Sequence, residues 1–189
     1  MASLPTDNLS PSDAEVAVRS FPSRFRRALE RPGDRDDRDD RDERDDRDAR
    51  DGAGDDAADP DELARRVGPE GRSAADHLIA ADGVLAILDR ALEQVRSDDD
   101  PVLHPAVGDL RGASWEDEHT PLPALLDQLE QTAGRCADRI DSVPTDDWGR
   151  QVRVADADMP VGTIDVVREA VDVVAAHLRS AERTIAAVR

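Results

Sequence analysis

The chain has 189 residues and a formal net charge of −19 at pH 7, and its 25 basic residues are all arginines. Binding to nucleic acid or to an anionic membrane requires a basic surface that neutralises phosphates, so we expect neither partner. A high net charge keeps a protein soluble at a cost in self-repulsion, as in halophiles. We therefore interpret the composition as halophilic, although a GC-rich genome would also explain the arginines.

Cysteine content and hydropathy favour a cytoplasmic protein. Cys136 is the sole cysteine, which excludes an internal disulfide and a cysteine-based zinc cluster. The first residues have neither the basic start nor the apolar run of a secretory signal. No stretch approaches the roughly 20 apolar residues that span a bilayer. Cys136 itself lies on an apolar helical stripe, so we expect a buried hydrophobic residue.

The first helix is expected to begin at Ser12, after a disordered segment of residues 1–11. Ser12 and Glu15 have the spacing of a capping box. Pro22 either kinks this helix or marks its first turn. The apolar positions that recur at helical spacing are Val18, Phe21, Phe25 and Leu29.

A low-complexity segment interrupts the foldable sequence at residues 32–59. Its centre, residues 35–51, reads RDDRDDRDERDDRDARD and contains no apolar residue except Ala49. Such a segment buries too little apolar surface to offset the entropy lost on ordering. We predict a disordered, solvated insert, with a binding tail as the alternative.

Three further helices are predicted from apolar spacings of three and four. The second begins near Ser73, with Asp76 as its capping partner, and ends at the run DDDP. The third begins at an N-cap on Thr120 with Pro121 in its first turn, and the fourth is capped by Thr163. The expected buried stripes are Leu78, Leu85, Leu88, Leu92 and Val95; Leu122, Leu126, Leu129, Ala133, Cys136, Ile140 and Val143; and Ile164, Val167, Val171, Val174, Leu178, Ala181, Ile185 and Val188.

This sustained spacing is typical of helices that pack nearly parallel. We therefore predict an all-α protein, an up-down four-helix bundle over residues 12–189 that is interrupted by the insert. The connection between the second and third helices is long, at about 20 residues. It contains His104 and His119, whose side chains we expect in solvent.

His77 and His177 are the candidate metal ligands. Each precedes a core leucine on a predicted helix, so both side chains are expected at the edge of the interior, where bundles build metal sites. Imidazole suits zinc or nickel. Two histidines do not complete a site, and a third ligand would come from Asp82, Asp172 or the loop. The alternative is that both are ordinary surface or partly buried histidines.

Several stretches together resemble the DinB-like superfamily, which includes the mycothiol-dependent maleylpyruvate isomerases and related thiol S-transferases. In chain order they are FPSRFRRALE, DELARRVGPEGRSAADHL, DDPVLHP, PTDDWGR and GTIDVVREAVDVVAAHLRSAERTI. The resemblance implies a four-helix bundle that binds a divalent metal through one histidine on the second helix and two ligands four residues apart on the last.

Mapped onto this chain, the resemblance retains part of that metal site. His177 matches the retained histidine of the last helix, and Val173 stands four residues earlier. Ala80 occupies the position of the histidine on the second helix, one turn after His77, and Arg72 replaces a tryptophan. The resemblance therefore implies a degenerate metal site.

We accordingly expect a small-ligand or protein-binding module, with no catalytic residues and no assured cofactor. The alternative is a divalent-metal-dependent thiol S-transferase that uses His77, His177 and a nearby aspartate around zinc or nickel. A structural or assembly protein is a third class. The partner is then an unknown small molecule or protein, and the chain is a monomer or a homodimer.

Overall fold

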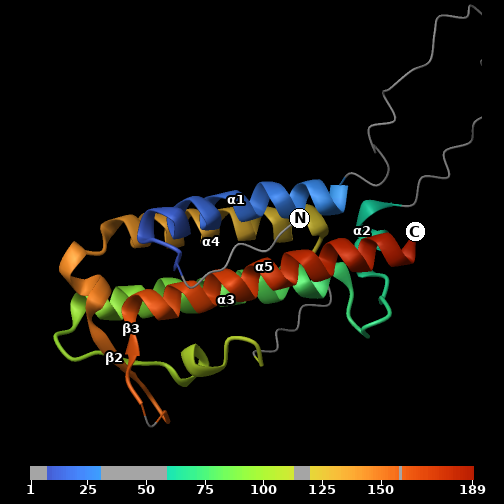
Figure 1. Ribbon diagram of the computed structural model, residues 1–189. Coiled ribbons are helices and arrows are strands. Elements are labelled where there is room, and N and C mark those ends of the chain that lie inside the picture. Colours follow the sequence, from blue (N-terminus) through green and yellow to red (C-terminus); the bar gives the residue numbers. More distant parts are fainter. Residues whose placement is uncertain (1–7, 31–58, 113–119, 158) are drawn as a thin grey trace, which may run out of the picture.

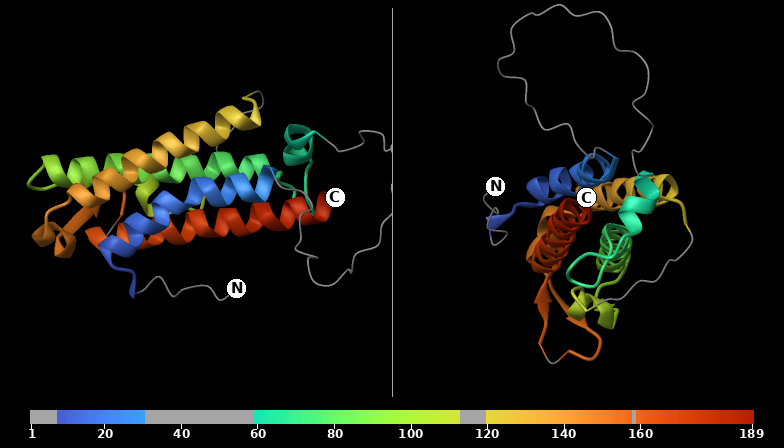
Figure 2. Two further views of the ribbon diagram at one scale, coloured as in Figure 1. Left: turned by 90° about the horizontal axis from the view of Figure 1, so that it is seen from above. Right: turned by 90° about the vertical axis from the view of Figure 1, so that its right-hand side faces the viewer.

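The computed structural model describes residues 8–30, 59–112, 120–157 and 159–189. Four long helices dominate this part of the chain and pack around one apolar core (Figure 1). They are α1 (Pro11–Glu30), α3 (Ala74–Ser97), α4 (Leu122–Ser142) and α5 (Thr163–Val188). We call these four helices the helical body. Seen end-on, they follow the order α1, α4, α3, α5 around the axis (Figure 2). The predicted all-α class is confirmed.

The helices of the body run up, down, down and up (Figure 1). Gln128 bonds Asp82 in the first halves of α4 and α3, and Arg96 bonds Ser142 at the last turns of α3 and α4, so these two helices are parallel. The alternating up-down order expected from the sequence is therefore not the order found. The parallel pair explains the long connection, because the chain must return along the 24 residues of α3, roughly 36 Å at 1.5 Å per residue.

Short elements fill the connections. They are α2 (Pro60–Arg65), β1 (Val102–Leu103), the 3₁₀ helices η2 (Pro105–Asp109) and η3 (Thr145–Gly149), β2 (Gln151–Val154) and β3 (Val161–Gly162). Strand β2 pairs in parallel with β1 and antiparallel with β3. This small sheet lies at one end of the body, and its strands were not predicted because they are only two to four residues long.

Helix α1 begins earlier than predicted. The Asp13 amide donates to the Ser10 hydroxyl at 3.2 Å, and the Ser10 amide donates to the Asp13 carboxylate at 3.3 Å. This reciprocal pair replaces the box expected at Ser12 and Glu15, and Pro11 takes the first helical position, where its missing N–H costs nothing. Pro22 lies inside the helix, not in its first turn.

The starts of the other helices agree with the sequence to within two residues. The capping box of Ser73 and Asp76 is confirmed. Helix α4 begins at Leu122, not at a Thr120 cap, and the Leu122 amide donates to the Asp61 carboxylate of α2 at 2.6 Å. A neighbouring element thus caps this helix. Thr163 was expected to cap α5, but Gly162 takes the N-cap position and Thr163 is the first helical residue, whose hydroxyl donates to the Arg150 carbonyl at 3.1 Å.

The predicted apolar stripes form the core. Every predicted position is buried except Ile164 and Val188, which are partly buried. Cys136 is among the buried residues, and burial raises the pKa of its thiol to about 12. It therefore packs as a small hydrophobic residue, as expected.

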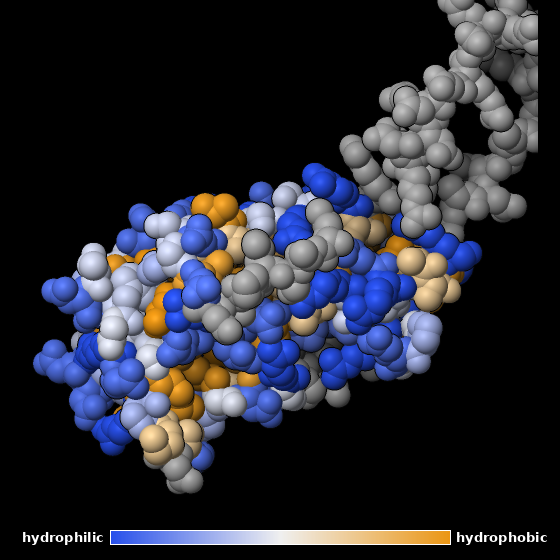
Figure 3. All heavy atoms as spheres, in the orientation of Figure 1, coloured by the Kyte–Doolittle hydropathy of each residue, from blue (hydrophilic) through white to orange (hydrophobic). Residues whose placement is uncertain are grey.

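Two predicted disordered segments fall largely on residues that the structure does not describe. Of the 32–59 insert, only Asp59 is described, and its carboxylate accepts from the Asp61 amide at the start of α2. Of residues 1–11, residues 8–11 are described; Pro11 is the first residue of α1, and Ser10 directly precedes it. Among the described helices, none has the length and apolar character needed to cross a membrane. Hydrophilic residues cover most of the face in Figure 3, and hydrophobic atoms form small patches on it.

Candidate functional site

The candidate site lies where the start of α3 meets the end of α5. These two helices are antiparallel neighbours, so the first turns of α3, which carry His77, lie beside the second half of α5, which carries His177. A loop over residues 66–73 closes this end. Its Gly68 lies so close to α5 that a Cβ there would be 2.8 Å from Thr184 Cγ2.

The two histidines contact each other through their Nδ1 atoms, which lie 3.3 Å apart. The ring centroids are 5.6 Å apart, and the ring planes are inclined at 42°. His77 is 5% exposed, and His177 is partly buried. The sequence placed both at the edge of the interior, and the structure brings them into contact. We call them the histidine pair.

The tautomers of the histidine pair follow from this contact. A neutral imidazole carries one N–H, so one Nδ1 donates and the other accepts. The accepting ring then holds its proton on Nε2, and the donating ring has a free lone pair there. Either arrangement therefore presents one Nε2–H donor and one Nε2 acceptor. Nε2 of His77 is buried and has no partner among the described residues.

Burial lowers the pKa of both imidazoles. The pKa of His177 falls to about 4 through desolvation first, then through His77 and the positive charges of Arg72 and Arg111. The pKa of His77 is also lowered, chiefly by desolvation and Arg72, although Glu70 and Asp76 act in the opposite direction. The histidine pair is therefore neutral at pH 7.

The arginines near the histidine pair differ in their partners. Arg111 donates to Glu169 at 2.9 Å and to Asp172 at 2.5 Å. Arg183 lies 3.4 Å from Glu70 and 3.0 Å from the Ser180 hydroxyl.

Arg72 is exposed and forms no ion pair with a carboxylate in the part of the chain that the structure describes. In the sequence, Arg72 stands out only as a replacement for a tryptophan. The feature that could have indicated its role is its position directly before the N-cap of the helix that carries His77. Arg72 therefore provides a positive charge close to both imidazoles.

The described residues fit a catalytic metal poorly. Two nitrogens bound to tetrahedral zinc at 2.0–2.1 Å lie roughly 3.4 Å apart, which matches the histidine pair, but catalytic zinc takes three protein ligands. Among the residues described, no group of three His, Cys, Asp or Glu side chains is placed to hold a metal ion. The position one turn before His177 is Val173, a buried aliphatic residue.

The expected third ligands point elsewhere. Asp82 and Asp172 each lie five residues from a histidine, which turns their side chains about 140° around the helix. Asp82 accepts from Gln128 at 2.6 Å on the α4 side, and Asp172 accepts from Arg111. The geometry therefore joins neither aspartate to the histidine pair.

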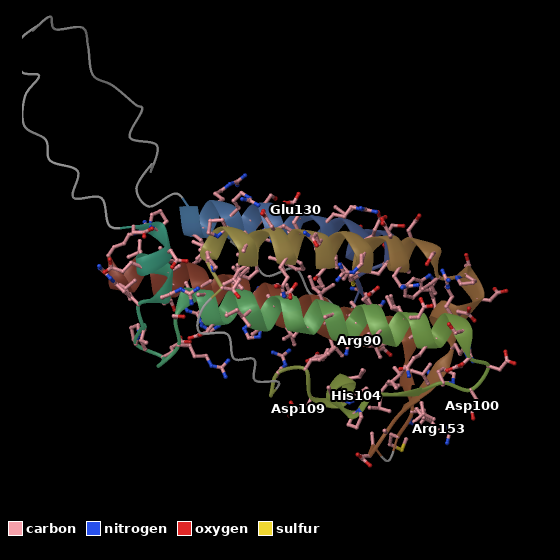
Figure 4. All side chains as sticks on the ribbon, turned by 180° about the vertical axis from the view of Figure 1, so that it is seen from behind. Arg90, Asp100, His104, Asp109, Glu130 and Arg153 are labelled. Atoms are coloured by element: carbon pink, nitrogen blue, oxygen red, sulfur yellow. The ribbon has the colours of Figure 1, made fainter. Side chains whose placement is uncertain are left out.

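The two remaining histidines contribute nothing to the site as described. His104 is exposed at the start of η2, where its Nδ1 accepts from the Ala106 amide at 3.2 Å. In Figure 4, His104 and Asp109 lie on the short segment below α3, and Asp100 and Arg153 lie close together near the sheet. His119 lies outside the described residues.

A hollow lies on the far side of the body, between α1 and α4, and we call it the α1–α4 groove. Its volume is about 740 Å³. Its lining residues are Arg19, Pro22, Ser23, Arg26, Arg27, Glu130, Ala133 and Gly134. Small side chains on both helices leave this space open, and arginines border it.

Comparison with known proteins identifies no relative. No protein-family model matches this chain, and neither a curated protein nor a solved structure does. The resemblance to the DinB-like superfamily therefore stays a prediction. Function has to be argued from the geometry of the histidine pair.

Proposed function

We propose that this protein is a DinB-like four-helix bundle with a degenerate metal site, and that it binds a small ligand at the histidine pair. The observation that carries the proposal is Nε2 of His77, which is buried beside a second imidazole and has no partner among the described residues. A buried polar atom without a hydrogen bond costs about 1–3 kcal/mol. A ligand that bonds to this nitrogen would remove that cost.

The surroundings of the histidine pair favour a ligand other than a metal ion. Histidines that bind metals almost always donate their second ring N–H to a carboxylate, a carbonyl or water. Here the Nδ1 atoms contact each other, and Arg72 lowers the pKa of both histidines, although Glu70 and Asp76 oppose it at His77. A cation would enter a site that already faces Arg72 and Arg111. The mostly buried pair also suits a small molecule better than a protein surface.

A second candidate function is a divalent-metal-dependent thiol S-transferase, and one observation favours it. The 3.3 Å between the Nδ1 atoms equals the spacing of two nitrogen ligands on zinc. In such an enzyme the metal would act as a Lewis acid and would stabilise a thiolate nucleophile. The described residues supply only two of the three ligands, so we rank this function second.

Calorimetric titration with Zn²⁺ separates the two functions. We compare the unmodified protein, His177→Ala, and His104→Ala as a control for an exposed histidine. The proposal expects weak, multi-site binding that is equal in all three, since an acidic surface attracts cations nonspecifically. One-to-one binding at micromolar or tighter Kd that disappears only in His177→Ala would overturn it in favour of the S-transferase.

A further inference from the structure

The hydrogen-bonding groups at the histidine pair define the kind of ligand that fits. The pair presents one Nε2–H donor in either tautomeric arrangement. Arg72 adds a guanidinium with five N–H donors in a planar fork, a shape that matches carboxylate and phosphate oxygens. Arg72 directly precedes the N-cap of α3 and acts on the pKa of both His77 and His177, so its guanidinium lies near the pair. The site is thus rich in donors.

The 66–73 loop has a geometry that fixes the position of Arg72. The Gly68 amide donates to the Arg72 carbonyl at 2.9 Å, and the Gly71 amide donates to the Gly68 carbonyl at 3.0 Å. Gly71 has a φ of +77°, a left-handed conformation that favours glycine. Contact between Gly68 and Thr184 holds the closed loop against α5. The backbone therefore places Arg72 beside both helices of the site.

The carboxylates near the histidine pair differ in their partners. Those of Glu169 and Asp172 are bonded to Arg111, and that of Glu70 faces Arg183. The Asp76 carboxylate, which acts on His77, accepts from the Ser73 amide at 2.7 Å. Arg72 forms no ion pair with a carboxylate among the described residues, so a ligand oxyanion would not have to displace one.

We propose that the ligand carries a small oxyanion group, a carboxylate or a phosphate, bound by Arg72 together with the Nε2–H of His77. This inference rests on the proposed function, because it assigns a chemical class to the ligand of the same site. Arg72 provides the charge and two parallel N–H bonds. His77 provides the buried donor that the structure leaves unpaired, in the tautomeric arrangement in which Nδ1 of His177 donates to Nδ1 of His77. Part of the affinity therefore depends on the planar fork of Arg72 and not on charge alone.

The test measures binding at the ring nitrogens of the two histidines. Protein labelled with ¹⁵N is titrated at pH 7 and constant ionic strength with inorganic phosphate, and separately with acetate. We expect at least one of the two anions to shift the ring resonances of His77 and His177 with a single saturable Kd. The anion that binds tighter identifies which of the two groups the ligand carries.

Two variants and a control connect this binding to Arg72. Arg72→Gln is expected to raise the Kd at least tenfold. Arg72→Lys keeps the charge and loses the planar fork, so its Kd should lie between those of the unmodified protein and Arg72→Gln. Arg66→Gln is the control, because Arg66 is an exposed arginine near the same loop whose partner is Glu62. It should leave the Kd unchanged. Arg72 is exposed, so the variants should keep the melting temperature of the unmodified protein.

Two results would overturn the inference. One is that neither anion moves the ring resonances up to 100 mM, and the other is that Arg72→Gln and Arg66→Gln bind equally well. Both leave the proposed small-ligand function standing, because that function fails on a different result, one-to-one Zn²⁺ binding that depends on His177. The two failures are therefore distinguishable in the same set of proteins.

Discussion

The helical body carries arginines on two of its sides, and the two sides differ in what the arginines face. In the α1–α4 groove, Arg19 donates to Asp138 at 2.7 Å. Arg26 lies 3.3 Å from Asp127 and 3.4 Å from Glu130. Arg19 and Arg26 therefore have carboxylate partners, whereas Arg27, which also borders the groove, forms no ion pair among the described residues. The groove therefore has the character of a solvated surface with ion pairs.

Between α3 and α5 the situation is reversed. Nε2 of His77 is buried without a partner, and Arg72 forms no ion pair with a carboxylate, among the residues that the structure describes. Unpaired buried groups cost free energy. The unsatisfied buried nitrogen makes the histidine pair the better candidate site in this protein.

The two sides should differ most in how much they contribute to folding. Leu178→Ala, next to His177, removes a fully buried side chain and should lower the free energy of unfolding by about 2–5 kcal/mol. Arg26→Gln in the groove removes exposed ion pairs and should cost less than about 1 kcal/mol. Urea unfolding measures both. Comparable losses would show that the groove is as structurally important as the α3–α5 side.

The pH dependence of stability should also distinguish the sides. The pKa of His177 is lowered from 6.5 to about 4 in the folded protein, so the unfolded chain takes up its proton first as the pH falls. The contribution of neutral His177 to the free energy of unfolding is complete above about pH 6.5 and is lost between pH 6.5 and 4. One pKa unit corresponds to about 1.4 kcal/mol, and partial exposure reduces the total, so we expect a loss on the order of 2 kcal/mol.

The matched variant for this prediction is His177→Gln, with His104→Gln as an exposed control. Carboxylates also titrate below pH 5, so only the difference between proteins is informative. The groups that face position 177, which are His77, Arg72 and Arg111, are unchanged in all three proteins. His177→Gln should lose less stability than the unmodified protein between pH 7 and 4.5. Parallel curves would show that His177 is not buried as described.

Much of the helical body could be predicted from the sequence, because apolar spacing reports burial directly. The stripes of α1 and α4 are buried at every predicted position. Helix starts were less predictable, since caps depend on tertiary contacts. The amide of Leu122 bonds to Asp61, which lies 61 residues away, and no local pattern reveals that. The directions of α3 and α4 were also missed, because apolar spacing carries no information on which way neighbouring helices run.

The candidate site was predictable in part for the same reason. The positions of His77 and His177 beside core leucines placed both at the edge of the interior, but only the antiparallel pairing of α3 and α5 brings them into contact. Asp82 and Asp172 were expected as third ligands from nearness in sequence, yet five residues of helix turn them to other faces. The place of Arg72 in the site could not be predicted, because it depends on how the 66–73 loop folds.

Raising the salt concentration should increase the stability of the protein as a whole, whereas it should weaken the ion pairs of the groove. Like-charge repulsion at a net charge of −19 weakens the folded state most when screening is poor. The screening length falls from about 30 Å at 0.01 M to about 3 Å at 1 M salt. We expect greater stability at 1 M KCl, by on the order of 1 kcal/mol. Equal stability at the two concentrations would contradict the halophilic interpretation.

The smallest expected effect is the coupling between Arg26 and Glu130 across the α1–α4 groove. The two side chains are 36% and 67% exposed, and their charged atoms lie 3.4 Å apart. A double-mutant cycle with Arg26→Gln, Glu130→Gln and the double variant isolates their interaction from the other contacts of each residue. For exposed pairs it should amount to about 0.2–1 kcal/mol at low salt and should shrink at 1 M KCl, because solvent and ions screen it.

Arg26 also faces Asp127, which takes over part of the charge when Glu130 is removed and lowers the measured coupling further. A coupling above 2 kcal/mol that persists at 1 M KCl would mean that the groove holds its charges out of solvent. The contrast between an ion-paired surface on one side and an unsatisfied site on the other would then be lost.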